Sequence, residues 1–325
     1  MKTKAKCSIC PKGCELAPGE TGDCRVRKNM AGEIRCTTYG EPCSLNIDPV
    51  EKKPLFHFLP GTPILSVATA GCNLHCKQCQ NWQISQTRLH ASRGSGARPA
   101  DIAKMALKRG CPAVAYTYTE PLVSFEYTFD CCKAASEAGL MNVLVTAAYI
   151  NPDPLRQICK YVDAANVDLK SFSDDFYRDI CGGALAPVLK ALTVMKKCGV
   201  MLEVTNLIIP TLNDSEEETK QLCGWVAENL GVETPLHFSR FFPQNKLQHL
   251  PPTPADTILR AREIAVEAGL QFVYVGNMHS TEGENTHCPS CGELLIERNG
   301  YSILQNRIKN GQCPACHAPV YGVWE

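Results

Sequence analysis

Segments of strand length alternate with amphipathic segments of helix length from residue 61 to about residue 280. Short apolar runs rich in β-branched residues are typical of buried strands, and apolar residues recurring every three or four positions are typical of helices. The predicted strands are 64–68, 113–118, 142–146, 164–169, 202–209, 235–241 and 272–275. The predicted helices are 99–109, 125–138, 153–161, 184–197, 216–230 and 253–267. Helices between successive strands predict an α/β fold with a parallel sheet, here a partial (β/α)6 barrel of the TIM type that stays open.

Cysteine is the outlying residue type, with 20 cysteines in 325 residues. The N-terminal residues MKTKAKCSICPKG contain no apolar signal segment, and many of the cysteines stand in close pairs, which favours metal or cluster binding over disulfides. Lys+Arg and Asp+Glu are both 33, so the formal charge of zero gives no bias toward nucleic acid or anionic lipid. No apolar run approaches the length of a membrane helix, and we expect a cytoplasmic protein without a membrane partner.

Cys72, Cys76 and Cys79 follow the first predicted strand in the motif GCNLHCKQCQNW. Three thiolates from one loop can bind three irons of a [4Fe–4S] cube and leave the fourth iron open to a ligand. The alternative is a structural iron–sulfur or zinc site that takes its fourth ligand from elsewhere in the chain. Active sites of TIM-type barrels lie at the carboxyl ends of the strands, so the position of this loop favours an open catalytic cluster.

This motif resembles that of the radical S-adenosylmethionine (SAM) superfamily. Further segments, DPVEKKPLFHFLPG, YTYTEP, VDLK and EVTNLIIPTLND, together with the cysteine-rich ends, make the chain similar to the radical enzymes of the AmmeMemoRadiSam system, relatives of the pyruvate formate-lyase activating enzymes. The resemblance implies a radical SAM partial barrel. It also implies reductive cleavage of SAM to a 5′-deoxyadenosyl radical, which abstracts hydrogen from a substrate, with electrons from a flavodoxin- or ferredoxin-like donor.

The resemblance also implies residues that bind SAM. The position before the third cysteine is usually aromatic in this superfamily, and here Gln78 stands there and can hydrogen-bond the adenine base. Asn81 lies in the same loop and suits an adenosine-bearing ligand. Glu120 ends the second strand and is expected to accept a charge-assisted bond from the methionyl ammonium, the alternative being a solvated loop acid.

Further candidates stand at the ends of the later strands. Relatives use the segment matching Asp168 and Lys170 to hold a monovalent cation beside the methionyl carboxylate, and Thr146 is the oxygen side chain available in the third loop. Asp168 could instead cap the next turn, and Lys170 could simply neutralise it. Asn206 faces the barrel interior only if its side of the strand points inward. Arg240 is a weaker candidate for a substrate carboxylate or phosphate.

Two cysteine-rich modules are predicted to flank the barrel, giving a Cys-rich segment at 1–60, the barrel at 61–283 and a small module at 284–325. The last contains two Cys-Pro-x-Cys pairs separated by 21 residues, which predict a zinc-ribbon or rubredoxin-like site, either structural zinc or a one-iron electron relay: Cys288, Cys291, Cys313 and Cys316. The first offers four cysteines for zinc or a second cluster, namely Cys7, Cys10, Cys14 and Cys24, with Cys36 and Cys43 as extra thiols. Seven others are expected to be buried hydrophobes: Cys111, Cys131, Cys132, Cys159, Cys181, Cys198 and Cys223.

Three functions remain open from the sequence. The enzyme could activate a partner protein by making a glycyl radical, or modify a small molecule or peptide in a pathway with Memo- and AMMECR-like proteins. A non-catalytic iron–sulfur electron carrier is the alternative from another class. A nucleic-acid substrate is disfavoured by the neutral charge. The Ser- and Gly-rich stretch at 92–96 predicts a mobile loop.

Overall fold

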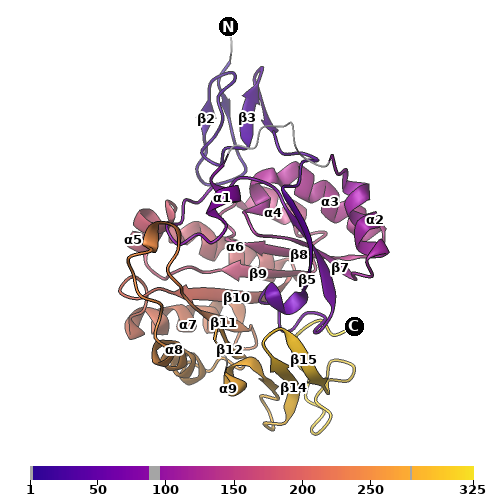
Figure 1. The fold of residues 1–325 in the computed structure, drawn as a ribbon, viewed down its shortest axis with the longest axis vertical. Coiled ribbons are helices and arrows are strands. Elements are labelled where there is room, and N and C mark those ends of the chain that lie inside the picture. Colours follow the sequence, from indigo (N-terminus) through magenta and orange to yellow (C-terminus); the bar gives the residue numbers. More distant parts are fainter. Residues whose placement is uncertain (1–2, 88–95, 279) are drawn as a thin grey trace.

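The computed structural model describes residues 3–87, 96–278 and 280–325, and an eight-stranded sheet lies at its centre (Figure 1). The spatial order is β12-β11-β10-β9-β8-β7-β6-β5, so each strand neighbours the next one in the chain. Strands β6 to β12 are parallel, and β5 pairs antiparallel with β6 at the edge. The strands are β5 Ser44–Pro49, β6 Pro63–Ala68, β7 Ala113–Tyr116, β8 Met141–Thr146, β9 Ala164–Asp168, β10 Met201–Ile208, β11 Leu236–Arg240 and β12 Val273–Gly276.

The predicted fold class is confirmed, because all seven predicted strands are present and lie parallel in one open sheet. Six longer helices follow in turn between the parallel strands: α2 Pro99–Lys108, α3 Phe125–Glu137, α4 Pro152–Ile158, α6 Leu185–Lys197, α7 Glu216–Leu230 and α8 Ala255–Glu267. Shorter turns of helix are α1 Trp82–Ser85, α5 Asp174–Phe176 and α9 Thr281–Glu284. At the start of α7, the Ser215 hydroxyl accepts a bond of 3.2 Å from the amide of Glu218 and so caps the helix.

Side chains alternate between two faces of the sheet and build two cores. Leu65 and Val67 of β6 belong to the larger core, which the helices cover. Ile64 of the same strand belongs to a smaller core on the other face, where Leu55 and Phe58 are fully buried. The segment from 50 to 59 therefore covers part of the inner face of the sheet.

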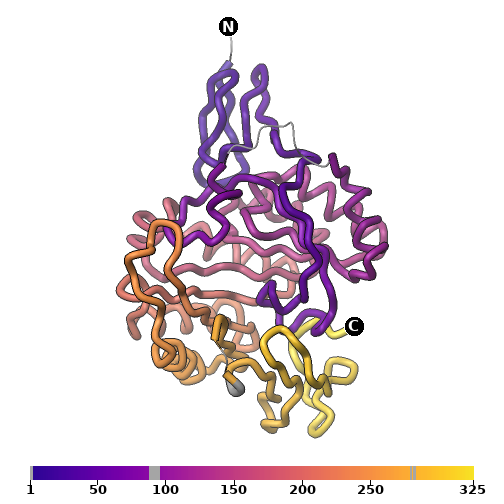
Figure 2. Tube along the Cα trace, in the orientation of Figure 1, coloured from indigo at the N-terminus to yellow at the C-terminus, as the bar shows by residue number. Residues whose placement is uncertain are grey.

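Small antiparallel sheets form both ends of the molecule. Near the N-terminus, β1 (Ala5–Lys6) pairs with β2 (Glu15–Leu16), and β3 (Arg27–Met30) pairs with β4 (Glu33–Cys36). The C-terminal module contains β13 (Thr286–His287), β14 (Leu294–Asn299) and β15 (Ser302–Asn306). Figure 2 shows the two modules at opposite ends of the long axis, with the large sheet between them.

One feature departs from the predictions, and another prediction falls outside the described residues. Strand β5 falls inside the segment expected to be only a cysteine-rich module, yet it joins the main sheet. It is an edge strand whose side chains are mostly half-buried or exposed, so it lacks a clear apolar alternation. The loop predicted at 92–96 lies outside the described residues, apart from Gly96. In the described part of the chain, none of the helices has the length and apolar character needed to cross a membrane.

Candidate active site

The loop that follows β6 carries Cys72, Cys76 and Cys79 and leads into α1. Backbone contacts hold it in place: the amide of His75 donates to the carbonyl of Cys181 at 2.7 Å, and the amide of Cys79 donates to the carbonyl of Cys76 at 3.1 Å. The three cysteines are half-buried at the carboxyl end of the strand, as the sequence predicts. The parallel strands β7, β8 and β9 end on the same edge, which brings their terminal residues toward this loop.

Cys181 contacts the loop that carries Cys72, Cys76 and Cys79, called the cluster loop below. Nothing in the sequence around Cys181 predicted this contact. Its thiol donates to the sulfur of Cys76, and the amide of Gln78 donates to Cys181 at 4.0 Å. The bond from Cys181 lowers the pKa of Cys76, and nearby Lys170 acts in the same direction. The effect favours the thiolate, which is the form that binds iron.

Gln78 supplies an unused acceptor beside the cysteines. The residue is buried, and its side-chain oxygen Oε1 has no hydrogen-bond partner. Buried polar groups in proteins are usually paired, so an orphaned acceptor next to three cysteine ligands fits a site built for a further polar group. The donor set and this acceptor together fit a cluster with an organic ligand on its open iron.

Glu120 and Thr146 are brought together by the ends of β7 and β8. One carboxylate oxygen of Glu120, Oε1, accepts from the Thr146 hydroxyl at 2.7 Å and from the amide of Leu122 at 3.1 Å. The other, Oε2, accepts from the amide of Ala147 at 2.9 Å. Burial raises the pKa of Glu120, and these bonds offset part of that effect. The charge of Glu120 in turn acts on the sulfur of Cys72, so this carboxylate lies near the cluster loop.

Asp168 and Lys170 form an ion pair of 2.8 Å at the end of β9. The Asp168 side chain is 40% exposed, whereas that of Lys170 is 17% exposed, so the carboxylate keeps an open side. Although burial opposes it, the charges of Asp168 and Cys76 raise the pKa of Lys170 well above its usual value. Lys170 therefore remains a cation beside the cluster loop.

Three further candidates bind backbone carbonyls. The amide of Asn81 donates to Tyr118 at 2.8 Å, and that of Asn206 donates to Leu169 at 2.8 Å. Arg240 donates to the carbonyl of Thr253, and its guanidinium lies over a neighbouring phenyl ring. These side chains hold loops at the edge of the sheet, and nothing in their contacts distinguishes them as ligand-binding groups.

The packing of β10 decides between the two faces that the periodicity of its sequence left open. Val204 lies on the same face of β10 as Asn206 and packs in the helix-covered core. Glu203 therefore points toward the other face of the sheet. The Glu203 carboxylate is fully buried and accepts from the ring of His237 at 2.5 Å and from the amide of His57 at 2.7 Å. The network ties the 50–59 segment to β10 and β11.

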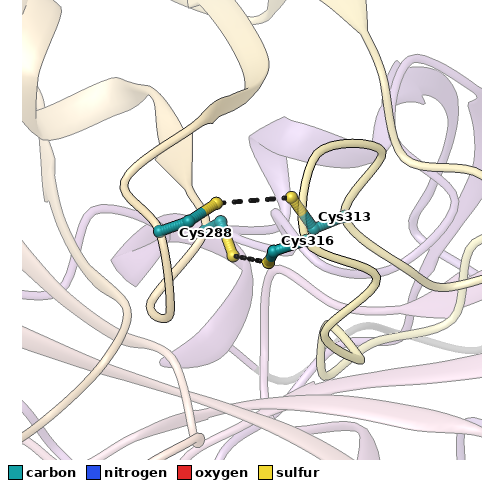
Figure 3. Close-up of side chains that lie close together, drawn as sticks. Cys288, Cys313 and Cys316 are labelled. Carbon is teal, nitrogen blue, oxygen red and sulfur yellow. Dashed lines mark hydrogen bonds between the residues drawn. The ribbon is translucent and has the colours of Figure 1, made fainter.

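The four cysteines of the C-terminal module converge on one point (Figure 3). Their sulfurs all lie within 4.8 Å of one another, with 3.6 Å between Cys288 and Cys316 and 3.7 Å between Cys291 and Cys313. Thiolates bound at about 2.3 Å to one tetrahedral ion stand about 3.8 Å apart, so these spacings fit a single zinc or iron. The structure thus has a metal-binding arrangement where the two Cys-Pro-x-Cys pairs predicted one.

The four N-terminal cysteines also meet, in a looser arrangement. Cys7, Cys10, Cys14 and Cys24 line one pocket in the small sheets above the cluster loop. Cys36 and Cys43 are not among its lining residues.

Comparison with known proteins agrees with this site. The model of the radical SAM superfamily matches residues 66–223. The chain is 45% identical to the uncharacterised protein MJ0808 of Methanocaldococcus jannaschii, covering 96% of this chain and 94% of that one. It is 26% identical to the pyruvate formate-lyase-activating enzyme of Clostridium pasteurianum, over 50% of this chain and 69% of the relative.

Solved structures share the fold at low identity. Streptococcus suis SuiB bound to S-adenosylmethionine has a TM-score of 0.52 and 15% identity, over 71% of this chain and 53% of SuiB. A radical SAM methyltransferase from Sphaerobacter thermophilus has a TM-score of 0.50 and 14% identity, over 73% of this chain and 71% of the methyltransferase. These structures show a shared fold. The match of the family model assigns residues 66–223 to the radical SAM superfamily, and the chain is similar to pyruvate formate-lyase-activating enzyme.

Proposed function

We propose that the protein cleaves SAM reductively at an open [4Fe–4S] cluster and removes a hydrogen atom from a substrate. The observation that carries the proposal is the three-cysteine loop at the end of β6, beside an orphaned buried acceptor on Gln78. Cys72, Cys76 and Cys79 would hold the cluster. When bound, the cluster and SAM supply a 5′-deoxyadenosyl radical.

The chain's own residues would bind and orient the two ends of SAM. Gln78 Oε1 accepts from the exocyclic amine of adenine, which would satisfy its buried oxygen. Glu120 Oε2 accepts one bond within the protein and keeps an acceptor position for the methionyl ammonium. Lys170 would pair with the methionyl carboxylate, and the exposed side of Asp168 would offer hard oxygen ligands for a monovalent cation.

Thr146, Asn81 and Asn206 would position rather than react. Thr146 holds the carboxylate of Glu120, while the two asparagines hold the ends of loops from β7 and β9. Arg240 remains a weaker candidate for an anionic group of the substrate, because its Nε is already bound to a backbone carbonyl.

The similarity to a pyruvate formate-lyase-activating enzyme supports a glycyl-radical activase as the first candidate reaction. The abstracted atom would then be the α-hydrogen of a glycine in a partner protein, with electrons from a flavodoxin- or ferredoxin-like donor. The second candidate is modification of a small molecule or peptide by an enzyme of the AmmeMemoRadiSam system. It rests on the sequence segments shared with that family across both cysteine-rich ends.

We assign the C-terminal site to structural zinc and treat 1–60, 61–283 and 284–325 as functional units, with β5 of the first unit completing the sheet of the second. The sulfur spacing suits a single tetrahedral ion, and small modules of this size commonly depend on such an ion for folding. The module sits at the end of the molecule opposite the N-terminal sheets, away from the cluster loop (Figure 2). This position supports a structural role over an electron relay.

The test is SAM cleavage by anaerobically reconstituted protein reduced with dithionite. We expect release of 5′-deoxyadenosine, its loss in Cys76→Ala, and its retention in the control Cys198→Ala, because Cys198 is exposed at the end of α6. Continued product release by Cys76→Ala would sink the mechanism. Glycine peptides deuterated at the α-carbon then separate the two reactions, since only an activase transfers that deuterium into 5′-deoxyadenosine.

A further inference from the structure

The N-terminal cysteines form a buried pocket that the mechanism above does not use. Cys7, Cys10, Cys14 and Cys24 line one small pocket. Cys7, Cys10 and Cys24 are each less than a tenth exposed. The amide of Cys7 donates to the carbonyl of Cys14 at 2.9 Å, so the loops that carry these residues are fixed against each other.

The spacing of these sulfurs differs from that of the C-terminal set. Among the described residues, Cys288 and its three partners are gathered within 4.8 Å of one another, but no three of the N-terminal sulfurs are. A single tetrahedral ion draws its thiolates to about 3.8 Å. A cluster has its irons at separate corners, so its thiolates stand further apart around an open centre. Four cysteines around a shared pocket fit the second arrangement.

Residues that line the pocket also contact the cluster loop directly. Asn73, the residue after Cys72, donates from its side-chain amide to the carbonyl of Tyr149 at 2.7 Å, and the same side chain lies beside the sulfur of Cys10. His75, between the first two catalytic cysteines, bonds the carboxylate of Asp23 at 2.9 Å. The side chain that lies beside Cys10 therefore belongs to the residue directly after Cys72.

Close packing reinforces this contact. Gly71 precedes Cys72 with a φ of 95°, and a Cβ added there would lie 2.7 Å from the carbonyl oxygen of Cys24. Lys12, Asp23 and Arg27 also line the pocket, and each cation is paired with a carboxylate, Lys12 with Asp23 at 2.9 Å and Arg27 with Glu126 at 2.7 Å. Lys12 bonds the carbonyl of Gly182 at 2.6 Å and so joins the pocket to the turn that follows Cys181.

We propose that Cys7, Cys10, Cys14 and Cys24 hold a second iron–sulfur cluster that supplies electrons to the catalytic cluster. The proposal that these cysteines bind a cluster does not depend on the proposed function. The proposal that this cluster supplies electrons does depend on it. In each turnover the second cluster takes one electron from an external flavodoxin- or ferredoxin-like donor. It then gives one electron to the catalytic cluster and returns to its oxidised state. Asn73 tunes this centre, because hydrogen bonds to cluster sulfurs help to set its potential.

The first test counts iron and acid-labile sulfide after anaerobic reconstitution. The triple variant Cys72→Ala/Cys76→Ala/Cys79→Ala removes the catalytic site, so the cluster proposed for the pocket is the only one left. We expect it to retain iron and sulfide and to give an EPR signal on reduction with dithionite. Zinc without sulfide in this variant, or loss of all iron, would overturn the proposal. Because this variant cannot cleave SAM, the result does not depend on the proposed function.

The second test measures contact between the two centres. Cys10→Ala/Cys24→Ala should lose one cluster and keep the catalytic one, whereas the control Cys36→Ala, outside the pocket, should keep both. The EPR spectrum of the fully reduced unmodified protein should show spin coupling that is absent from both cluster-deficient variants. A spectrum equal to the sum of the two variants would refute electronic contact. Mössbauer spectroscopy of the unmodified protein gives the cluster count if a variant does not fold.

Discussion

Arg298 joins the C-terminal module to the large sheet, and its replacement by lysine tests how much that joint contributes to stability. The side chain is 4% exposed and lies in β14. Its guanidinium donates to the carbonyl of Glu284 at 3.0 Å, the hydroxyl of Thr286 at 2.7 Å and the carbonyl of Phe56 at 2.8 Å. It also lies 4.4 Å from the centre of the Phe56 ring. The same side chain therefore contacts both the module and the 50–59 segment.

Arg298→Lys keeps the positive charge but loses the planar fork that reaches several acceptors at once. One ammonium group can serve one or two of these buried acceptors, and each acceptor left without a partner costs about 1–3 kcal/mol. Loss of the contact to Phe56 and one other acceptor thus lowers the free energy of unfolding by roughly 2–6 kcal/mol. The module should also detach more readily and become sensitive to protease between residues 286 and 325.

Arg307→Lys is the matched control. Arg307 lies in the same module but is 41% exposed and pairs at the surface with Glu293 at 2.6 Å. Surface pairs contribute about 0–1 kcal/mol, so this variant should stay close to the unmodified protein. Urea unfolding of the metal-loaded protein measures the stability of both variants. Equal stability of the two would show that the buried contacts of Arg298 do not hold the module in place.

Other perturbations follow from single contacts. Burial lowers the pKa of His57 from 6.5 to about 4, so the ring is neutral in the folded protein. The contribution of His57 to the free energy of unfolding should be complete above pH 6.5 and should fall by about 3 kcal/mol toward pH 4. A melting temperature that does not change over this pH range would contradict this assignment. Phe58→Ala should lower the free energy of unfolding measured in urea by about 3–5 kcal/mol, because Phe58 is fully buried. The control Leu107→Ala, at an exposed residue, should change it very little. Similar changes in the two variants would argue against a core on the inner face of the sheet. Gly71→Ala should reduce reconstituted iron content, because its Cβ would lie 2.6 Å from Val26; full iron content would show that the loop adapts.

The sequence predicted those features that repeat locally. Apolar runs and helical spacing located every parallel strand, because burial on both faces leaves a clear pattern. Boundaries were less certain: β7 ends at Tyr116, two residues before its predicted end, and Tyr118 beyond it has a φ of 66° that does not continue a strand. The C-terminal cysteine pairs were also recognisable, since knuckle spacing is a local property of the chain.

Contacts between distant segments could not be predicted in this way. Cys181 looked like an ordinary buried cysteine, and it meets Cys76 only because a turn after β9 packs on the cluster loop. The contact between Asn73 and Cys10 depends likewise on how the N-terminal sheets sit on the barrel. For Asn206, periodicity left two faces open, and only the packing of its neighbours decided between them.

The two cysteine modules occupy opposite ends of the barrel, and this position separates their roles (Figure 1). The C-terminal one packs Leu295 and Ile296 against Phe56 and Tyr274, on the side of the 50–59 segment, with no described contact to the cluster loop. The N-terminal one contacts that loop through Asn73. Removing the metal proposed for the C-terminal site with a chelator should therefore lower stability and leave the catalytic cluster's spectrum unchanged. Substituting the N-terminal cysteines should instead change iron content and spin coupling while the C-terminal metal stays bound. If chelation of the C-terminal metal altered the cluster spectrum as strongly as loss of Cys10 and Cys24, the division between a structural end and an electron-transfer end would fail.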